Sequence, residues 1–173
     1  MFCDDVNGIA IHIGHLRSYI GYIGDEMPLY QSESFFRPSS AGRVAEGFED
    51  LTRNLSSESL ISPLVANEQV NNTEVYADFM SRFAEKINAN LNEVGVIMSM
   101  HSHQKSDVER LQLAHLLFEQ HNCPALYFAN KNVTSLFSSG KITGTLIDSG
   151  AYSTDIVPIV EGFAIRRGKL TSH

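Results

Sequence analysis

The chain has 173 residues, of which 43% are hydrophobic and 19% are charged, and its formal net charge is −7. The length allows one domain with a hydrophobic core, and the acidic balance excludes a basic surface for nucleic-acid backbone. We therefore expect no direct nucleic-acid binding. Because no apolar run approaches the length of a membrane span, we also expect no membrane insertion.

The first predicted element is a β-hairpin over residues 6–24, in the stretch VNGIAIHIGHLRSYIGYIG. Apolar residues alternate on both sides of a turn at Gly14, which is typical of two antiparallel strands. By this alternation we expect Ile13 to face the core. A glycine turn of this kind can bring backbone N–H groups close to a phosphate.

Residues 27–72 give a poor signal for regular structure. The segment SESFFRP is a candidate strand, and RNLSSESLISP is expected to be a loop. Because the segment is too long for a plain connection, we predict a small excursion or subdomain here.

Regular patterns return at residue 73. Apolar positions recur every fourth residue over 73–91, which predicts a helix with Thr73 as its N-cap. The residues that follow predict a buried strand over 93–100, a helix over 106–122 that begins with a Ser106 and Glu109 capping box, a strand over 125–129, a short helix over 132–140, a strand over 142–149 and a second hairpin over 154–165. We therefore predict an α/β fold, with a mixed sheet flanked by helices and no internal repeat.

Three segments resemble the actin and actin-related protein family. GYIGDEMP is similar to a Gly-aromatic-Ala-Gly-acidic-acidic-x-Pro stretch of the family, and ISPLVANEQVNN is similar to the segment before its first long helix. Residues 116–165 follow the family almost position by position. This resemblance implies a ribonuclease-H-like fold of two lobes with ATP in the cleft. We expect residues 1–173 to form a single first lobe with a mixed five-stranded sheet, residues 29–72 to be a divergent second subdomain, and the second lobe to be absent.

Within the family, DSGA and the lysine of ANKNV most resemble the nuclear, fourth class of actin-related proteins. The resemblance implies a non-catalytic scaffold subunit of a chromatin-remodelling or histone acetyltransferase complex, in the nucleus and secondarily in the cytoplasm. The implied partners are actin and a helical segment of the remodeller ATPase subunit. A divergent cytoskeletal actin-like protein that binds ATP is the alternative.

The resemblance also implies the position of a degenerate ATP cleft. Its candidate residues are Gly14, His15, Leu16, Lys131, Asp148, Ser149 and Gly150. The family has a metal-facing carboxylate where this chain has His12, whereas Mg²⁺ prefers oxygen ligands. Lys131 stands where the family orients the attacking water, and an ammonium can only donate hydrogen bonds. We therefore expect no catalytic residue, no hydrolysis, and either no ATP binding or weak binding.

Two interpretations of the first hairpin are open. It is either a histidine-modified phosphate loop or a structural hairpin that has lost its ligand role, and we favour the second because Tyr19 also replaces a basic residue. The second hairpin keeps more of the pattern, although Ala151 departs from actin and the ring of Tyr152 would crowd a phosphate.

A metal site at His101 and His103 is a further hypothesis. The two histidines follow a predicted strand, but no cysteine and no third histidine stand at ligand spacing. Solvated loop histidines are therefore the favoured interpretation, and we expect no metal.

Overall fold

The computed structural model describes residues 8–36, 62–66, 69–70, 73–100 and 106–172. Most of the predicted excursion, at residues 37–61, lies outside the described residues, as do His101, His103 and the first two positions of the predicted hairpin. None of the helices in the described part combines the length and the apolar character needed to cross a membrane.

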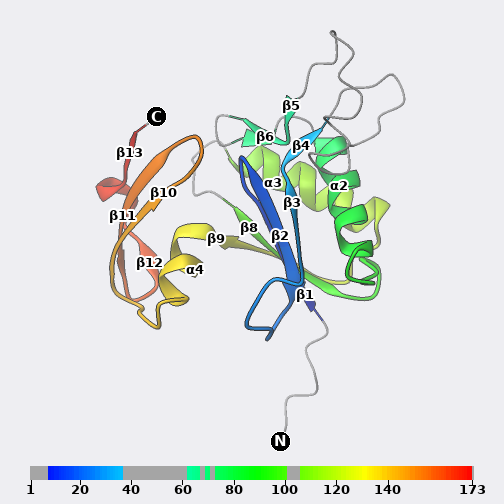
Figure 1. Ribbon diagram of the computed structural model, residues 1–173, viewed down its shortest axis with the longest axis horizontal. Coiled ribbons are helices and arrows are strands. Elements are labelled where there is room, and N and C mark those ends of the chain that lie inside the picture. Colours follow the sequence, from blue (N-terminus) through cyan, green and yellow to red (C-terminus); the bar gives the residue numbers. More distant parts are fainter. Residues whose placement is uncertain (1–7, 37–61, 67–68, 71–72, 101–105, 173) are drawn as a thin grey trace, which may run out of the picture.

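A five-stranded mixed sheet forms the centre of the molecule, as predicted (Figure 1). Its strands are β1 (Gly8–Ile13), β2 (Arg17–Tyr22), β3 (Tyr30–Glu33), β8 (Gly95–Met100) and β9 (Leu126–Asn130), in the order β3-β2-β1-β8-β9. Strand β1 is antiparallel to β2, with Ile11 opposite Ile20, and parallel to β8, with Ile11 opposite Met98.

Short strands follow the central hairpin. They are β4 (Phe35–Phe36), β5 (Ser62–Pro63), β6 (Val65–Ala66) and β7 (Gln69–Val70), which pair as β4 with β5 and β6 with β7. The predicted strand at SESFFRP is therefore interrupted. At the interruption, the buried Ser34 hydroxyl lies 2.7 Å from that of Ser18 and ties the segment to β2.

Two helices cover one face of this sheet (Figure 1). They are α2 (Thr73–Glu85) and α3 (Ser106–His115), and α3 continues into a π-helical turn, Leu116–Gln120. Helix α2 begins at Thr73, which is helical instead of a cap, and ends six residues before the predicted limit at residue 91. The chain reverses at Asn88, whose φ of 56° is left-handed.

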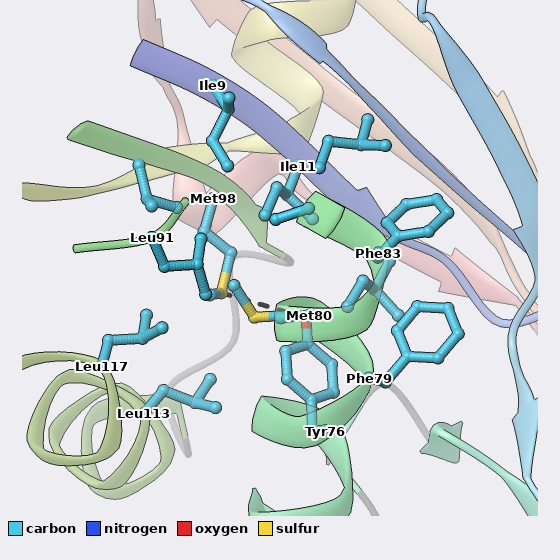
Figure 2. Close-up of a cluster of buried hydrophobic side chains, with 14 of the residues drawn as sticks. Ile9, Ile11, Tyr76, Phe79, Met80, Phe83, Leu91, Met98, Leu113 and Leu117 are labelled. Carbon is cyan, nitrogen blue, oxygen red and sulfur yellow. Dashed lines mark hydrogen bonds between the residues drawn. The ribbon is translucent and has the colours of Figure 1, made fainter. Parts of the chain in front are cut away.

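The main core lies between the sheet and these helices (Figure 2). Alternate residues of β1 point into it, since Ile9, Ile11 and Ile13 are each at most 3% exposed, as the alternation predicted. From the helix side, Tyr76 is fully buried and its hydroxyl donates a hydrogen bond to Sδ of Met98 at 3.9 Å. Burial of these side chains fixes which face of β1 and β8 is left for the cavity described below.

The strands after residue 143 form a second sheet, whereas the sequence predicted a single one. Its strands are β10 (Gly144–Ser149), β11 (Thr154–Val160), β12 (Phe163–Ala164) and β13 (Leu170–Ser172), and β11 pairs antiparallel with the other three. Helix α4 (Lys131–Phe137) lies between the two sheets, and a 3₁₀ turn, Arg166–Gly168, precedes β13 (Figure 1). The second sheet separates because α4 packs Leu136 against Val157 and Ile159 in a small core of its own.

The hairpins β1–β2 and β10–β11 have the same construction, although the sequence has no internal repeat. In each, a six-residue strand leads to a glycine turn. The amide of Gly14 donates to the carbonyl oxygen of Arg17 at 3.0 Å, and that of Gly150 donates to Ser153 at 2.9 Å. The side chains that follow the two glycines differ, since His15 and Leu16 follow Gly14 whereas Ala151 and Tyr152 follow Gly150.

Candidate functional site

A cavity of about 630 Å³ lies against the face of the first sheet that α2 and α3 leave uncovered. Both hairpins contribute to its lining, together with β8 and α4. Five of the seven predicted site residues line it, namely Gly14, His15, Lys131, Asp148 and Gly150. The fold thus brings together residues that lie more than 130 positions apart in the sequence.

The other two predicted site residues, Leu16 and Ser149, do not line the cavity. Leu16 projects from the turn and is 47% exposed. Ser149 follows Asp148 in β10, and neighbouring residues in a strand point to opposite faces. Its hydroxyl lies 3.0 Å from that of Thr154.

The glycine at the first turn is required by close packing of the backbone. A Cβ at Gly14 would lie 2.8 Å from the carbonyl oxygen of Arg17, which is closer than real Cβ atoms approach. At Gly150 the nearest atom, the carbonyl oxygen of Ser153, would lie at 3.4 Å. The two turns therefore differ in how strictly they need glycine.

Aromatic and imidazole rings occupy the space between the turns. The rings of His15 and Tyr152 lie with centroids 5.1 Å apart, so that one ring from each hairpin meets the other. The Nδ1 atom of His15 is buried and has no hydrogen-bond partner among the described residues. Deeper in the first hairpin, the rings of His12 and Tyr19 stack at 6.3 Å.

An ion pair joins the two sheets beside these rings. The Nζ atom of Lys131 lies 2.8 Å from Oδ2 of Asp148, and the two side chains are 13% and 33% exposed. Lys131 is the first residue of α4, and Asp148 comes from β10. The cap of α4 fixes the start of the helix, because the side chain of Asn130 accepts a hydrogen bond from the amide of Asn132 at 3.0 Å.

The imidazole of His12 is held in its neutral form. Burial lowers its pKa below the ordinary 6.5, and the positive charge of Lys131 lowers it further, although Asp148 opposes this effect. In the sheet, His12 lies opposite Tyr19 on one side and Ser99 on the other. A neutral imidazole adds no charge to the cavity at pH 7.

Sequence reasoning missed Asp155, a buried carboxylate on the face of β11 that also carries Val157 and Ile159. It is 1% exposed, its Oδ2 lies 3.1 Å from Nζ of Lys169, and its Oδ1 accepts a hydrogen bond from Thr171 at 2.7 Å. Burial alone would raise the pKa of this carboxyl, but Thr171 and Lys169 outweigh burial and hold the pKa below its ordinary value. The sequence does contain a signal for this residue. Asp155 stands at a position that alternates with apolar core residues of the strand, and a buried carboxylate requires a hydrogen-bond or cationic partner.

The lining of the cavity contains both positively and negatively charged side chains. Arg17 and Lys131 are its basic residues, and Asp25, Glu26 and Asp148 are its acidic ones. Within the described part of the chain, no three His, Cys, Asp or Glu side chains gather where they could hold a metal ion. The cavity therefore offers both basic and acidic side chains to a polar ligand.

Comparison with known proteins gives a match over most of the chain. A family model described as Actin matches residues 3–173. Actin-related protein 4 of Schizosaccharomyces pombe is 27% identical over 171 residues, which are 98% of this chain and 39% of that relative. Actin-related protein 4 of Mycosarcoma maydis is 42% identical over 59 residues, which are 34% of this chain and 11% of the relative. The chain thus spans about two fifths of the length of the first relative.

Proposed function

The chain belongs to the actin family and is similar to actin-related protein 4, and from this we propose that it is a non-catalytic scaffold subunit of a nuclear chromatin-remodelling or histone acetyltransferase complex. Its proposed partners are actin and a helical segment of the remodeller ATPase subunit, and its proposed location is the nucleus, with the cytoplasm as a second location. The ion pair between Lys131 and Asp148 is the observation that carries the non-catalytic part of the proposal.

The cofactor that this family implies is ATP with a divalent cation. Mg²⁺ requires oxygen ligands in octahedral geometry, and it is usually held by carboxylates together with phosphates. Here the Asp148 carboxylate is paired with Lys131 at 2.8 Å, and the neighbouring ionisable group is the neutral imidazole of His12. These residues do not fit a divalent cation, which supports our proposal that the protein binds Mg-ATP weakly or not at all and does not hydrolyse it.

A scaffold needs an exposed surface that a partner can cover, and the outer face of the second sheet offers one. Cross-strand register places five apolar residues on this face. We call this set the outer patch, and it consists of Ile147, Ile156, Val160, Phe163 and Leu170. Phe163 is 74% exposed, Ile147 67% and Leu170 66%. An exposed apolar patch of this kind is typical of protein interaction sites.

Affinity purification of the protein from its native cells tests the proposal. We expect chromatin-remodelling or histone acetyltransferase subunits, together with actin, to be recovered. Recovery of cytoskeletal proteins alone would reject the nuclear assignment and favour the cytoskeletal alternative.

Variants of the outer patch test the surface itself. Phe163→Glu places a charge on an exposed apolar position, so we expect it to reduce partner recovery about tenfold without changing the unfolding midpoint. Lys141→Glu, at an exposed residue outside the patch, is the matched control and should leave recovery unchanged. Equal recovery with both variants would show that partners do not bind the outer patch.

A further inference from the structure

Helix α3 has apolar side chains on two opposite sides. Leu113 and, in the π-helical turn that continues the helix, Leu117 are fully buried and point into the main core (Figure 2). On the other side of α3, Val108 is 65% exposed and Leu111 is 71% exposed. A helix that only covers a sheet needs one apolar face, so the second face requires an explanation of its own.

The exposed residues of α3 have the spacing at which one helix packs against another. Val108, Leu111 and His115 are separated by three and then four positions, which places them on one side of the helix. Phe118, in the π-helical turn, follows three positions later and is 44% exposed. We call these four residues the α3 stripe. Alternating steps of three and four residues are those of the a and d positions in paired helices.

The charges beside the α3 stripe favour a basic partner over a second copy of the chain. Residues 106–120 carry three acidic residues and one basic residue, namely Asp107, Glu109, Glu119 and Arg110. Arg110 offsets part of the charge of Asp107, whose carboxylate lies 3.7 Å away. Asp107 and Glu119 are exposed next to the two ends of the stripe. Whether two copies paired parallel or antiparallel, acidic residues would face acidic residues, which disfavours self-association.

We propose that the α3 stripe binds an amphipathic helix of a partner protein, one that has lysine or arginine residues beside its apolar side. The apolar side chains of this helix cover the α3 stripe, and its basic residues face Asp107 and Glu119. The stripe is a second surface, on a different element from the outer patch. The inference therefore goes beyond the proposed function, and its test uses no nuclear partner.

Fluorescence anisotropy of the purified protein with three synthetic peptides tests the proposal. Each peptide is about three heptads long. The first has leucine at positions a and d and lysine at e and g, the second has glutamate in place of lysine, and the third has the composition of the first with its leucines spread around the helix. We expect the first peptide to bind at least about tenfold more tightly than either of the others. Equal binding of the first peptide and either of the others, or no binding of the first, would overturn the proposal.

A matched pair of substitutions shows whether the first peptide binds the α3 stripe. Leu111→Gln removes an apolar side chain of the stripe, and Ile147→Gln makes a similar change in the outer patch, at a side chain that is 67% exposed. We expect Leu111→Gln to weaken binding about tenfold and Ile147→Gln to leave it unchanged. Since both side chains are exposed, the unfolding midpoints in circular dichroism should not change. Equal affinities of the two variants would show that the peptide binds elsewhere, against the proposal.

Two further measurements test the charge and the choice of partner. Asp107→Asn combined with Glu119→Gln removes the acidic charges at the ends of the stripe, so the affinities of the lysine and glutamate peptides should come within about threefold of each other. An unchanged preference for the lysine peptide would contradict the proposed role of these charges. In sedimentation of the protein alone, we expect Leu111→Gln to change nothing. A dimer that Leu111→Gln disrupts would overturn the proposal and assign the α3 stripe to a second copy of the chain.

Discussion

At the scale of single residues, the pair formed by Asp155 and Lys169 predicts an asymmetry between its two partners. Lys169→Met leaves the carboxylate buried at 1% exposure without its paired cation, and this should cost about 3 kcal/mol of unfolding free energy. Asp155→Asn should cost less, because an amide oxygen still accepts the Thr171 hydrogen bond and the lysine can turn toward water. Urea unfolding at pH 7 measures both. A larger loss for Asp155→Asn would contradict this account.

The neutral His12 predicts a dependence of stability on pH. Its pKa in the folded protein lies below the unfolded value of 6.5, so below that value the unfolded chain binds a proton that the folded protein does not. Stability should therefore fall as the pH drops from 6.5 toward the folded pKa. Urea unfolding at pH 7.5 and pH 5.5 should show a smaller loss for His12→Gln than for the unchanged protein. Equal losses would mean that His12 is not held neutral by the fold.

At the scale of elements, the first hairpin predicts which of two apolar truncations is costly. Ile13→Ala removes a side chain that is 3% exposed, so we expect it to cost about 2 to 4 kcal/mol. Leu16→Ala makes a similar truncation three residues further on, at a side chain that is 47% exposed, and should stay within about 0.5 kcal/mol. Denaturant unfolding of both variants checks this. Similar losses would mean that burial does not decide the stability of the hairpin.

The two glycine turns provide a matched pair of substitutions. Gly14→Ala places a methyl group 2.8 Å from a backbone oxygen that cannot move without breaking the turn, so it should cost about 1 to 3 kcal/mol. At Gly150 the corresponding distance is 3.4 Å, and Gly150→Ala should cost less than about 1 kcal/mol. Thermal unfolding of the two variants compares the turns directly, and the reverse order would contradict the packing argument.

The elements that the sequence predicted best are those with a strong local period. Alternation identified the first hairpin and its buried face, and the fourfold apolar repeat identified α2. The end of α2 was predicted too late because Ile87 continues the apolar period, whereas Asn88, a residue type that tolerates the left-handed conformation, reverses the chain. Ile87 is still only 8% exposed, so its apolar character reports burial and not helix.

The candidate site was predicted in part, for a related reason. Gly14, Lys131 and Asp148 follow from family resemblance, and all three line the cavity. The ion pair between Lys131 and Asp148 could not be predicted, because it depends on how α4 places one sheet beside the other. The ring contact between His15 and Tyr152 is a long-range contact of the same kind.

At the scale of the whole molecule, the two sheets have very unequal cores. The first core runs from β1 across α2 and α3, whereas the second consists of Leu136, Val157 and Ile159 with a few partly buried neighbours. A sheet with so little buried apolar surface should open at a lower free energy than the rest of the protein. In native-state hydrogen exchange, the amides of β10 and β11 should therefore exchange faster than those of β1 and β8.

Leu136→Ala tests whether that difference comes from the small core. Leu136 is 6% exposed and projects from α4, so its truncation should destabilise the second sheet by at least about 2 kcal/mol, which is roughly a thirtyfold increase in exchange rate for β10 and β11. The amides of β1 and β8 should keep their rates if the sheets open separately, because their core does not include Leu136. Equal acceleration in both sheets would show instead that α4 and the ion pair of Lys131 with Asp148 couple them into one cooperative unit. The cavity between the hairpins would then open only when the whole protein unfolds.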